Sequence, residues 1–139
     1  MSKRRNKWVN KTFTVASGSA AGDYTFSFTT DKGYGHVEGV AFCERTNGKA
    51  SGRNPYLIGL KETNCDKVIL DPLPKQLILA AGEENDQNFL PYPERFINMG
   101  TQMVAGGIEY TITVRTTATL DENLVIDTTF KHTNYDVNP

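Results

Sequence analysis

The chain has few of the side chains that enzymes and metal proteins use for chemistry. Its 139 residues include two histidines, two cysteines and one tryptophan. Zinc and cupin-type sites need clustered ligands at short spacings such as CxxC or HxH, and neither pattern occurs around His36, His132, Cys43 or Cys65. We therefore expect no metal ion, no cofactor and no enzymatic activity, with each histidine at the surface or at a strand end.

The cysteines and carboxylates give no stronger signal. Two cysteines without a secretory signal are expected to stay reduced as small buried residues. Glu38 and Glu109 are the acids within predicted strands, and each falls on the polar side of its alternation, so we expect both to be solvated. An enzyme remains the alternative only if one of them converges with His36 and His132 in a single pocket.

Long hydrophobic runs are also absent. The longest covers residues 77–81, whereas a membrane span needs about 18 apolar residues. The charged start, MSKRRNKW, leads into alternating polar and apolar residues and not into the apolar core of a signal peptide. We expect no membrane span and no signal peptide, and a protein that stays in the cytoplasm where it is made.

The charge is distributed unevenly along the chain. The first eleven residues hold five cations and no acid, and the rest has a balance of −6. The cations are Lys3, Arg4, Arg5, Lys7 and Lys11. Residues 1–7 therefore read as a basic N-terminal arm that can lie on nucleic acid or on the acidic surface of a neighbouring subunit. A disordered, solubilising terminus is the alternative.

What the chain does have is apolar residues at every second position. Residues 107–119 alternate in this way through Ile108, Tyr110, Ile112 and Val114, and residues 124–133 run back after a turn, which predicts a C-terminal hairpin. Further strands are predicted at residues 8–15, 24–29, 35–45, 56–62 and 68–70. Glycines in the 35–45 strand predict a bulge or a close approach of another segment.

Prolines limit the remaining assignments. Pro72 and Pro74 interrupt the chain after residues 68–70, and residues 75–81 can be strand or helix, with strand favoured. Seven to nine short strands and no convincing helix predict an all-β antiparallel sandwich or barrel. We expect a single domain over residues 8–133 and an extended tail at 134–139.

Two loops and the scattered aromatic residues complete the inventory. Residues 83–86 are acidic but lack the spacing of a calcium loop, and residues 48–53 combine glycines and cations without a phosphate-loop pattern. Phe89, Leu90 and Tyr92 alternate with prolines, which indicates an extended apolar segment packed on a surface. With Trp8 they are candidates for an interface.

The basic arm, the alternating strands and the loop at residues 89–93 together resemble small single jelly-roll or β-sandwich structural proteins of bacteriophage virions. The resemblance implies a jelly-roll-like fold, a location in the virion after synthesis in the host cytoplasm, and capsid or penton-like assembly with copies of itself and other virion proteins. The interface residues would be Lys3, Arg4, Arg5, Lys7, Trp8, Phe89, Leu90 and Tyr92. Since the rest of the chain is acidic, contact with other subunits is favoured over tight genome binding.

A second interpretation belongs to a different class. A glycan-binding or host-surface-binding module of a fibre or spike would use exposed tryptophan or tyrosine rings arranged as one flat platform. Burial of those rings between subunits would favour the structural subunit instead.

Overall fold

The computed structural model of the chain describes residues 4–45, 55–65, 67–74, 79–81, 96–100 and 102–135. Within these residues it contains nine strands and no helix, hence none that could cross a membrane. The strands are β1 (Arg4–Val15), β2 (Gly22–Thr29), β3 (His36–Arg45), β4 (Tyr56–Glu62), β5 (Val68–Pro74), β6 (Leu79–Ala81), β7 (Ile97–Asn98), β8 (Glu109–Thr116) and β9 (Leu124–Tyr135). The predicted all-β class is confirmed.

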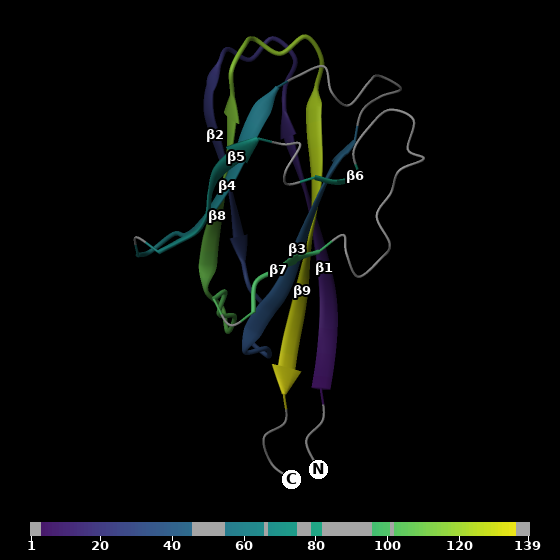
Figure 1. Cartoon of the computed structure of the whole chain (residues 1–139), viewed down its shortest axis with the longest axis vertical. Coiled ribbons are helices and arrows are strands. Elements are labelled where there is room, and N and C mark those ends of the chain that lie inside the picture. Colours follow the sequence, from purple (N-terminus) through teal and green to yellow (C-terminus); the bar gives the residue numbers. More distant parts are fainter. Residues whose placement is uncertain are drawn as a thin grey trace.

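The strands form two sheets that face each other as a sandwich (Figure 1). Sheet A has the order β1-β9-β3-β6, with β7 also paired to β3, and sheet B has the order β2-β8-β4-β5. The antiparallel pairs include β1 with β9, β2 with β8, β3 with β7 and β4 with β5. Strands from the two ends of the chain thus pair successively inward, as in a long hairpin that is folded over into two sheets. This is a jelly-roll-like sandwich, and its one irregular neighbour is β6, which runs parallel to β3.

The predicted C-terminal hairpin is wrong. The alternation that defines β8 and β9 is present, but β8 pairs with β2 and β4 in sheet B, and β9 pairs with β1 and β3 in sheet A. The turn between them therefore crosses from one sheet to the other (Figure 1). Periodicity fixes which side chains face the core, but it does not fix which strand lies alongside.

The strand at residues 68–70 is longer than predicted, because β5 continues through both prolines to Pro74. β5 lies at the edge of sheet B, where a residue without an N–H group costs no hydrogen bond if that group would face outward. Gly59 of β4 makes the pairing possible, since a Cβ there would lie 3.2 Å from Pro72 Cγ. Of the predicted strand at 75–81, residues 79–81 form β6, and residues 75–78 lie outside the described part of the chain.

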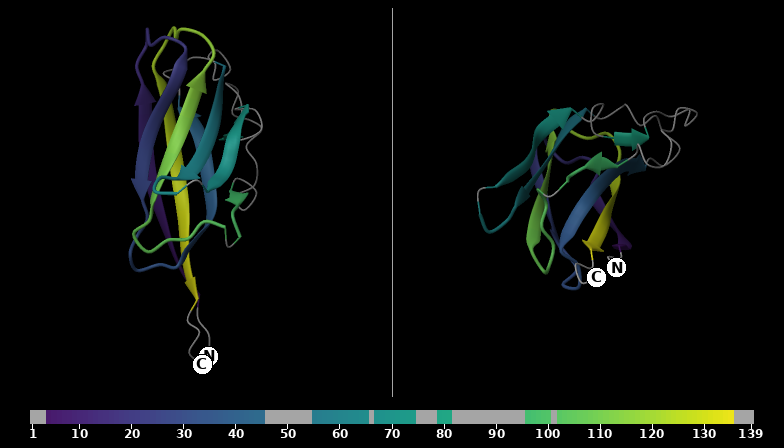
Figure 2. Two further views of the ribbon diagram at one scale, coloured as in Figure 1. Left: turned by 90° about the vertical axis from the view of Figure 1, so that its left-hand side faces the viewer. Right: turned by 60° about the horizontal axis from the view of Figure 1, so that its bottom comes forward.

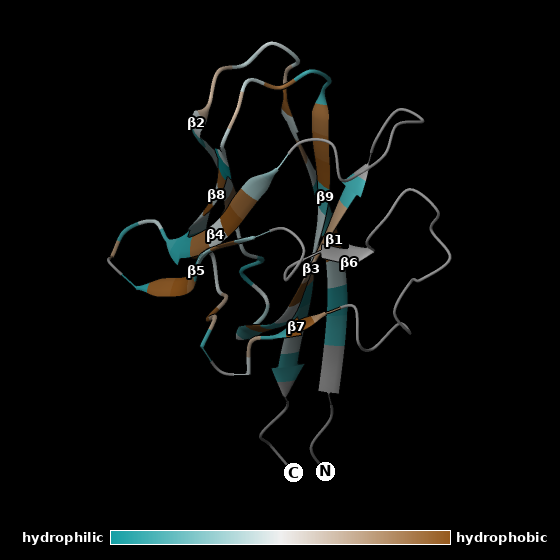
Figure 3. Ribbon diagram, turned by 45° about the horizontal axis from the view of Figure 1, so that its top comes forward, coloured by the Kyte–Doolittle hydropathy of each residue, from teal (hydrophilic) through white to brown (hydrophobic). Residues whose placement is uncertain are grey.

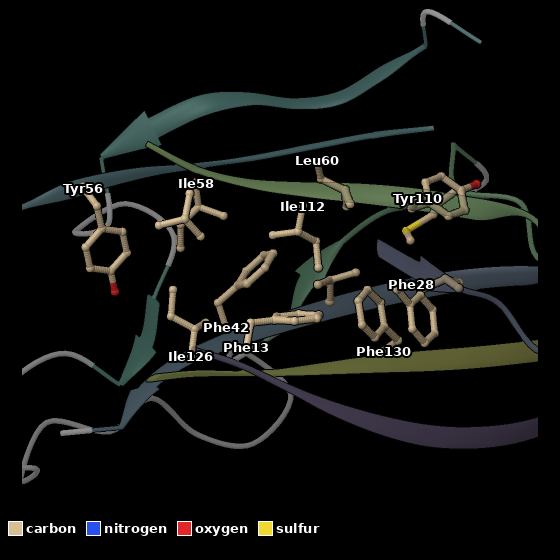
Figure 4. Packing of buried hydrophobic residues seen from close by; sticks show 14 of the residues in the cluster. Phe13, Phe28, Phe42, Tyr56, Ile58, Leu60, Tyr110, Ile112, Ile126 and Phe130 are labelled. Atoms are coloured by element: carbon tan, nitrogen blue, oxygen red, sulfur yellow. The ribbon is translucent and has the colours of Figure 1, made fainter. Parts of the chain in front are cut away.

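The core lies between the sheets and is rich in aromatic rings (Figure 4). Phe28 of β2 stacks on Phe130 of β9 with ring centroids 3.8 Å apart, and Phe13 of β1 stacks on Phe26 of β2 at 4.9 Å. Both pairs join sheet A to sheet B. The buried residues of β8 are those of the predicted period of two, which confirms that part of the sequence pattern.

Sheet A is longer than sheet B at one end. β1 and β9 each have twelve residues and pair from Arg4 with Tyr135 to Val15 with Leu124, whereas β2 and β8 have eight. Figure 2 shows the β1–β9 ribbon extending past the strands of sheet B. The first strand thus begins at Arg4 and not at residue 8, so residues 4–7 of the predicted arm are part of the sandwich. The predicted bulge in β3 is present between Val37 and Gly39.

Candidate assembly surface and a buried histidine

The first strand forms an open edge of sheet A. β1 pairs with β9 on one side, and no described strand pairs with it on the other. An open edge presents N–H and C=O groups that can pair with another chain, and lysine side chains on it restrict that pairing. Lys7 and Lys11 are both exposed on β1. The edge can therefore accept a strand whose charge and register suit these lysines.

On the outer face of sheet A beside this edge, polar side chains of β1 and β9 form a row of cross-strand hydrogen bonds, here called the polar ladder. Thr12 Oγ1 donates to Asp127 Oδ1 at 2.6 Å, and Thr129 Oγ1 donates to Asn10 Oδ1 at 3.3 Å. The same pattern continues at Thr133, whose hydroxyl donates to Asn6 Oδ1 at 3.0 Å. Cross-strand pairs of this kind stabilise the register of β1 on β9. They also leave a flat face that offers amide and hydroxyl groups to a partner.

Trp8 stands in the middle of this ladder and is 46% exposed. The Nζ of Lys131 lies 5.6 Å from the centroid of its ring and 3.0 Å from Glu38 Oε1 on β3. A cation over an indole ring stabilises the ring's position by about 0.5–1 kcal/mol at an exposed site. Glu38 is thus not simply solvated as predicted, because its carboxylate is ion-paired and helps to place Lys131 beside the ring.

Lys7 points to the opposite face of β1. Its Nζ lies 2.6 Å from Asp31 Oδ2 in the segment that joins β2 to β3. The hydrogen bond from Lys7 and a second one from the Gly33 N–H lower the pKa of the Asp31 carboxyl, and the pairing with Asp31 raises the pKa of Lys7. Lys7 is therefore engaged within the chain.

His132 is the clearest difference from the sequence prediction. Expected at the surface or at a strand end, it is completely buried, with its ring edge-on to Phe28 and Tyr34 at centroid distances of 5.9 and 5.8 Å. Its Nε2 accepts the Asp31 backbone N–H at 3.2 Å, so the proton of the neutral ring is on Nδ1, which lies 3.4 Å from the Phe130 carbonyl oxygen. Burial lowers the pKa of His132.

Two of the predicted interface residues have described side chains, and they lie on opposite faces of sheet A. Lys7 and Trp8, as strand neighbours, pair with His132 and Lys131 on opposite faces of sheet A. The backbones of Arg4 and Arg5 begin β1. The other predicted interface residues lie outside the described part of the chain; they are Lys3, Phe89, Leu90 and Tyr92. The calcium-like and phosphate-like loops at 83–86 and 48–53 also lie outside it.

The residues of the enzyme alternative are not brought together. His132 faces the core from β9, whereas His36 pairs with Thr133 and so belongs to the outer face. Glu109 is in sheet B. Among the described residues there is no group of three or more His, Cys, Asp or Glu side chains placed to bind a metal ion. Neither Cys43 nor Cys65 is part of a disulfide; Cys43 is partly buried, and Cys65 is exposed and not buried as predicted.

The outer face of sheet B has a shallow depression of about 240 Å³ beside β5. Arg115 Nε donates to Asp23 Oδ1 at 2.8 Å on its rim, and this pairing lowers the pKa of Asp23. Figure 3 shows an apolar stretch on β5, in the β4–β5 hairpin that projects here. Val68, the first residue of β5, is 53% exposed. The depression is open to solvent, and Arg115 and Asp23 on its rim form an ion pair with each other.

No family model matches the chain, and no curated protein matches it. Solved structures do match it, and one of them is described here. A solved structure of the virus-like particle of the extra small virus of the giant freshwater prawn Macrobrachium rosenbergii is 19% identical, covers 94% of this chain and 79% of that chain, and has a TM-score of 0.32. The jelly-roll-like assignment follows from the strand order and register given above.

Proposed function

We propose that this chain is a non-enzymatic structural subunit of a virus particle, a capsid or penton-like protein of a bacteriophage. It assembles through contacts with copies of itself and with other virion proteins, is made in the host cytoplasm and ends in the virion. The observation that carries the proposal is a jelly-roll-like sandwich whose twelve-residue first strand is an open edge. Jelly rolls are a common architecture of viral capsid domains.

The edge supports assembly for a physical reason. Unpaired strand groups are a liability in an isolated sandwich, and oligomerisation covers them. Beside the edge of β1, Trp8 adds apolar area to an otherwise polar face, which is the composition of a subunit contact with an aromatic centre and a polar rim. The acidic balance of the rest of the chain favours protein partners over nucleic acid. Any contact with nucleic acid is weak and limited to the basic N-terminal segment.

Assembly of the purified chain tests the proposal directly. Light scattering across a wide concentration range, followed by electron microscopy, is expected to find defined oligomers or closed particles. The variant Trp8→Thr is expected to move the onset of assembly to higher concentration, whereas Val68→Thr, which removes a similarly exposed apolar side chain from β5, should leave it unchanged. A chain that remains monomeric at every concentration contradicts the proposal.

A glycan-binding module of a fibre or spike is the second candidate, and the exposure of Trp8 is the observation that favours it. An indole ring beside asparagine and threonine side chains offers both a stacking surface and hydrogen-bonding groups. Titration of oligosaccharides against the fluorescence of this single tryptophan tests it. Saturable quenching by a sugar would favour the module, and its absence together with assembly would favour the subunit.

A further inference from the structure

The segment of residues 30–35 crosses from β2 in sheet B to β3 in sheet A and is held at Asp31. The carbonyl oxygen of Asp31 accepts the N–H groups of Tyr34 at 3.4 Å and Gly106 at 3.1 Å. Its carboxylate accepts Gly33 N–H at 2.8 Å and Lys7 Nζ at 2.6 Å. One residue thus connects the crossing segment, the segment before β8, and the first residues of β1.

The fifth bond of Asp31 ends on the buried imidazole. Its own N–H donates to His132 Nε2, which can accept only while that nitrogen carries no proton. Protonation would place two N–H groups against each other and replace an attraction by a repulsion. Because His132 is fully buried, the Asp31 amide cannot be satisfied by turning the ring toward water without opening the segment.

The groups around the imidazole compensate a positive charge only in part, and burial outweighs them. Lys7 faces it from β1 and disfavours the charge, and Asp31 faces it from the crossing segment and favours it, but these two are already paired with each other. β2 contributes the Phe28 ring, the crossing segment adds Tyr34, and β3 contributes Val37, which is paired with His132 in the sheet. Backbone hydrogen bonds to Phe130 and Lys7 also favour the charged ring, but burial is the larger influence and lowers the pKa of His132.

We propose that His132 is a proton-operated latch. In its neutral form it holds residues 30–35 and, through Asp31 and Lys7, the first residues of β1 on the end of the sandwich; on protonation this end opens. The opening is local because the ribbon of β1 and β9 extends beyond sheet B at this end (Figure 2), so little of the core shared by the two sheets is lost. It frees the Lys7 ammonium from Asp31.

The direction of the pH dependence follows from burial. An exposed histidine titrates near pH 6.5, and burial lowers the pKa of His132 in the closed form. The open form therefore takes up the proton first, and the closed form is fully favoured only above about pH 6.5. Below that value the opening equilibrium grows by about tenfold per pH unit until the pKa of the closed form is reached.

Amide hydrogen exchange followed by NMR tests the latch on the isolated chain, whether or not the chain assembles. Between pH 7.5 and pH 5, corrected for the intrinsic exchange rate, the protection of the Asp31 amide and of the β1 amides up to Trp8 is expected to fall, with the loss beginning below about pH 6.5. The Ile112 amide in the centre of β8 exchanges only when the whole fold opens, so it should stay far better protected than the Asp31 amide at every pH. The variant His36→Gln leaves His132 as the single histidine and gives its titration directly.

The matched variant is His132→Gln, whose side-chain carbonyl can accept the Asp31 N–H but does not titrate. Its Asp31 protection is expected to be independent of pH over the same range. If this variant does not fold, the coincidence of the His132 titration with the loss of Asp31 protection in His36→Gln decides. Unchanged Asp31 protection, the same pH response in His132→Gln, or Asp31 protection as high as that of Ile112 at pH 5 would each overturn the proposal.

Discussion

Replacing a buried threonine by valine is expected to raise the free energy of unfolding at one position and to lower it at another. Thr128 lies in the core on β9, fully buried, and its Oγ1 has no hydrogen-bond partner in the described part of the chain. An unsatisfied buried hydroxyl costs about 1–3 kcal/mol, and a methyl group of nearly the same size carries no such cost. We therefore expect Thr128→Val to raise the free energy of unfolding by about 1–2 kcal/mol.

Thr30 is also buried, but its hydroxyl group makes three hydrogen bonds. Its Oγ1 accepts the N–H groups of Gly107 at 3.1 Å and Ile108 at 2.9 Å, and it donates to the Ile108 carbonyl at 3.2 Å. Thr30→Val removes the acceptor of two backbone amides, so we expect a loss of about 1–3 kcal/mol. Thr116→Val is intermediate, because one acceptor role, toward the Gly22 N–H at 3.2 Å, is lost.

Urea unfolding followed by circular dichroism and by the fluorescence of Trp8 measures all three variants. The slope of the free energy with urea should not change, because the surface exposed on unfolding is the same. The two extreme variants, Thr128→Val and Thr30→Val, should differ by at least about 2 kcal/mol. The reasoning is refuted if Thr128→Val is less stable than the wild type, or if Thr30→Val is as stable.

Three further predictions concern stability. Because burial lowers the pKa of His132 in the fold, unfolding takes up a proton below about pH 6.5, and the wild type should lose stability there while His132→Gln loses less. Gly59→Ala brings a Cβ within 3.3 Å of a β5 carbonyl oxygen and should cost about 1–3 kcal/mol, whereas Gly35→Ala, with 3.6 Å to its nearest atom, should cost under about 0.5; equal midpoints in thermal unfolding would contradict this. Phe28→Ala and Phe130→Ala should each cost about 3–5 kcal/mol, and the double variant should fall short of their sum by about 1 kcal/mol; strict additivity would exclude a coupling between the stacked rings.

The alternating patterns predicted the burial of side chains well and the pairing of strands poorly. Tyr110, Ile112 and Val114 face the core as predicted from their spacing. Their neighbour in sequence, β9, is in the other sheet. The alternation would be the same if the turn between β8 and β9 stayed within one sheet, because the apolar side of each strand would face the core in both arrangements. A period of two contains no information about that choice.

Two predictions were wrong although the sequence contained a signal against them: the length of β5 and the position of His132. β5 runs through Pro72 because Gly59 opposite it leaves room, and a glycine in a predicted neighbouring strand was the available signal. His132 lies six residues after Ile126 and two after Phe130, so the period of two already placed it on the buried side. What the spacing did not contain is the segment of residues 30–35, which comes from the other sheet to cover the imidazole.

The basic N-terminal segment shows why composition does not define a surface. Five cations within eleven residues suggest one positive arm, yet β1 distributes neighbouring side chains to opposite faces of sheet A. Lys7 is used within the chain to hold Asp31, and Trp8 next to it is presented outward on the ladder with β9. Because the two residues have different tasks, removing residues 1–7 as a block would disturb the fold and the candidate surface together. Deletion of residues 1–3, which ends before β1, and substitution of Trp8 alone separate the charge of the terminus from the contact surface of the strand.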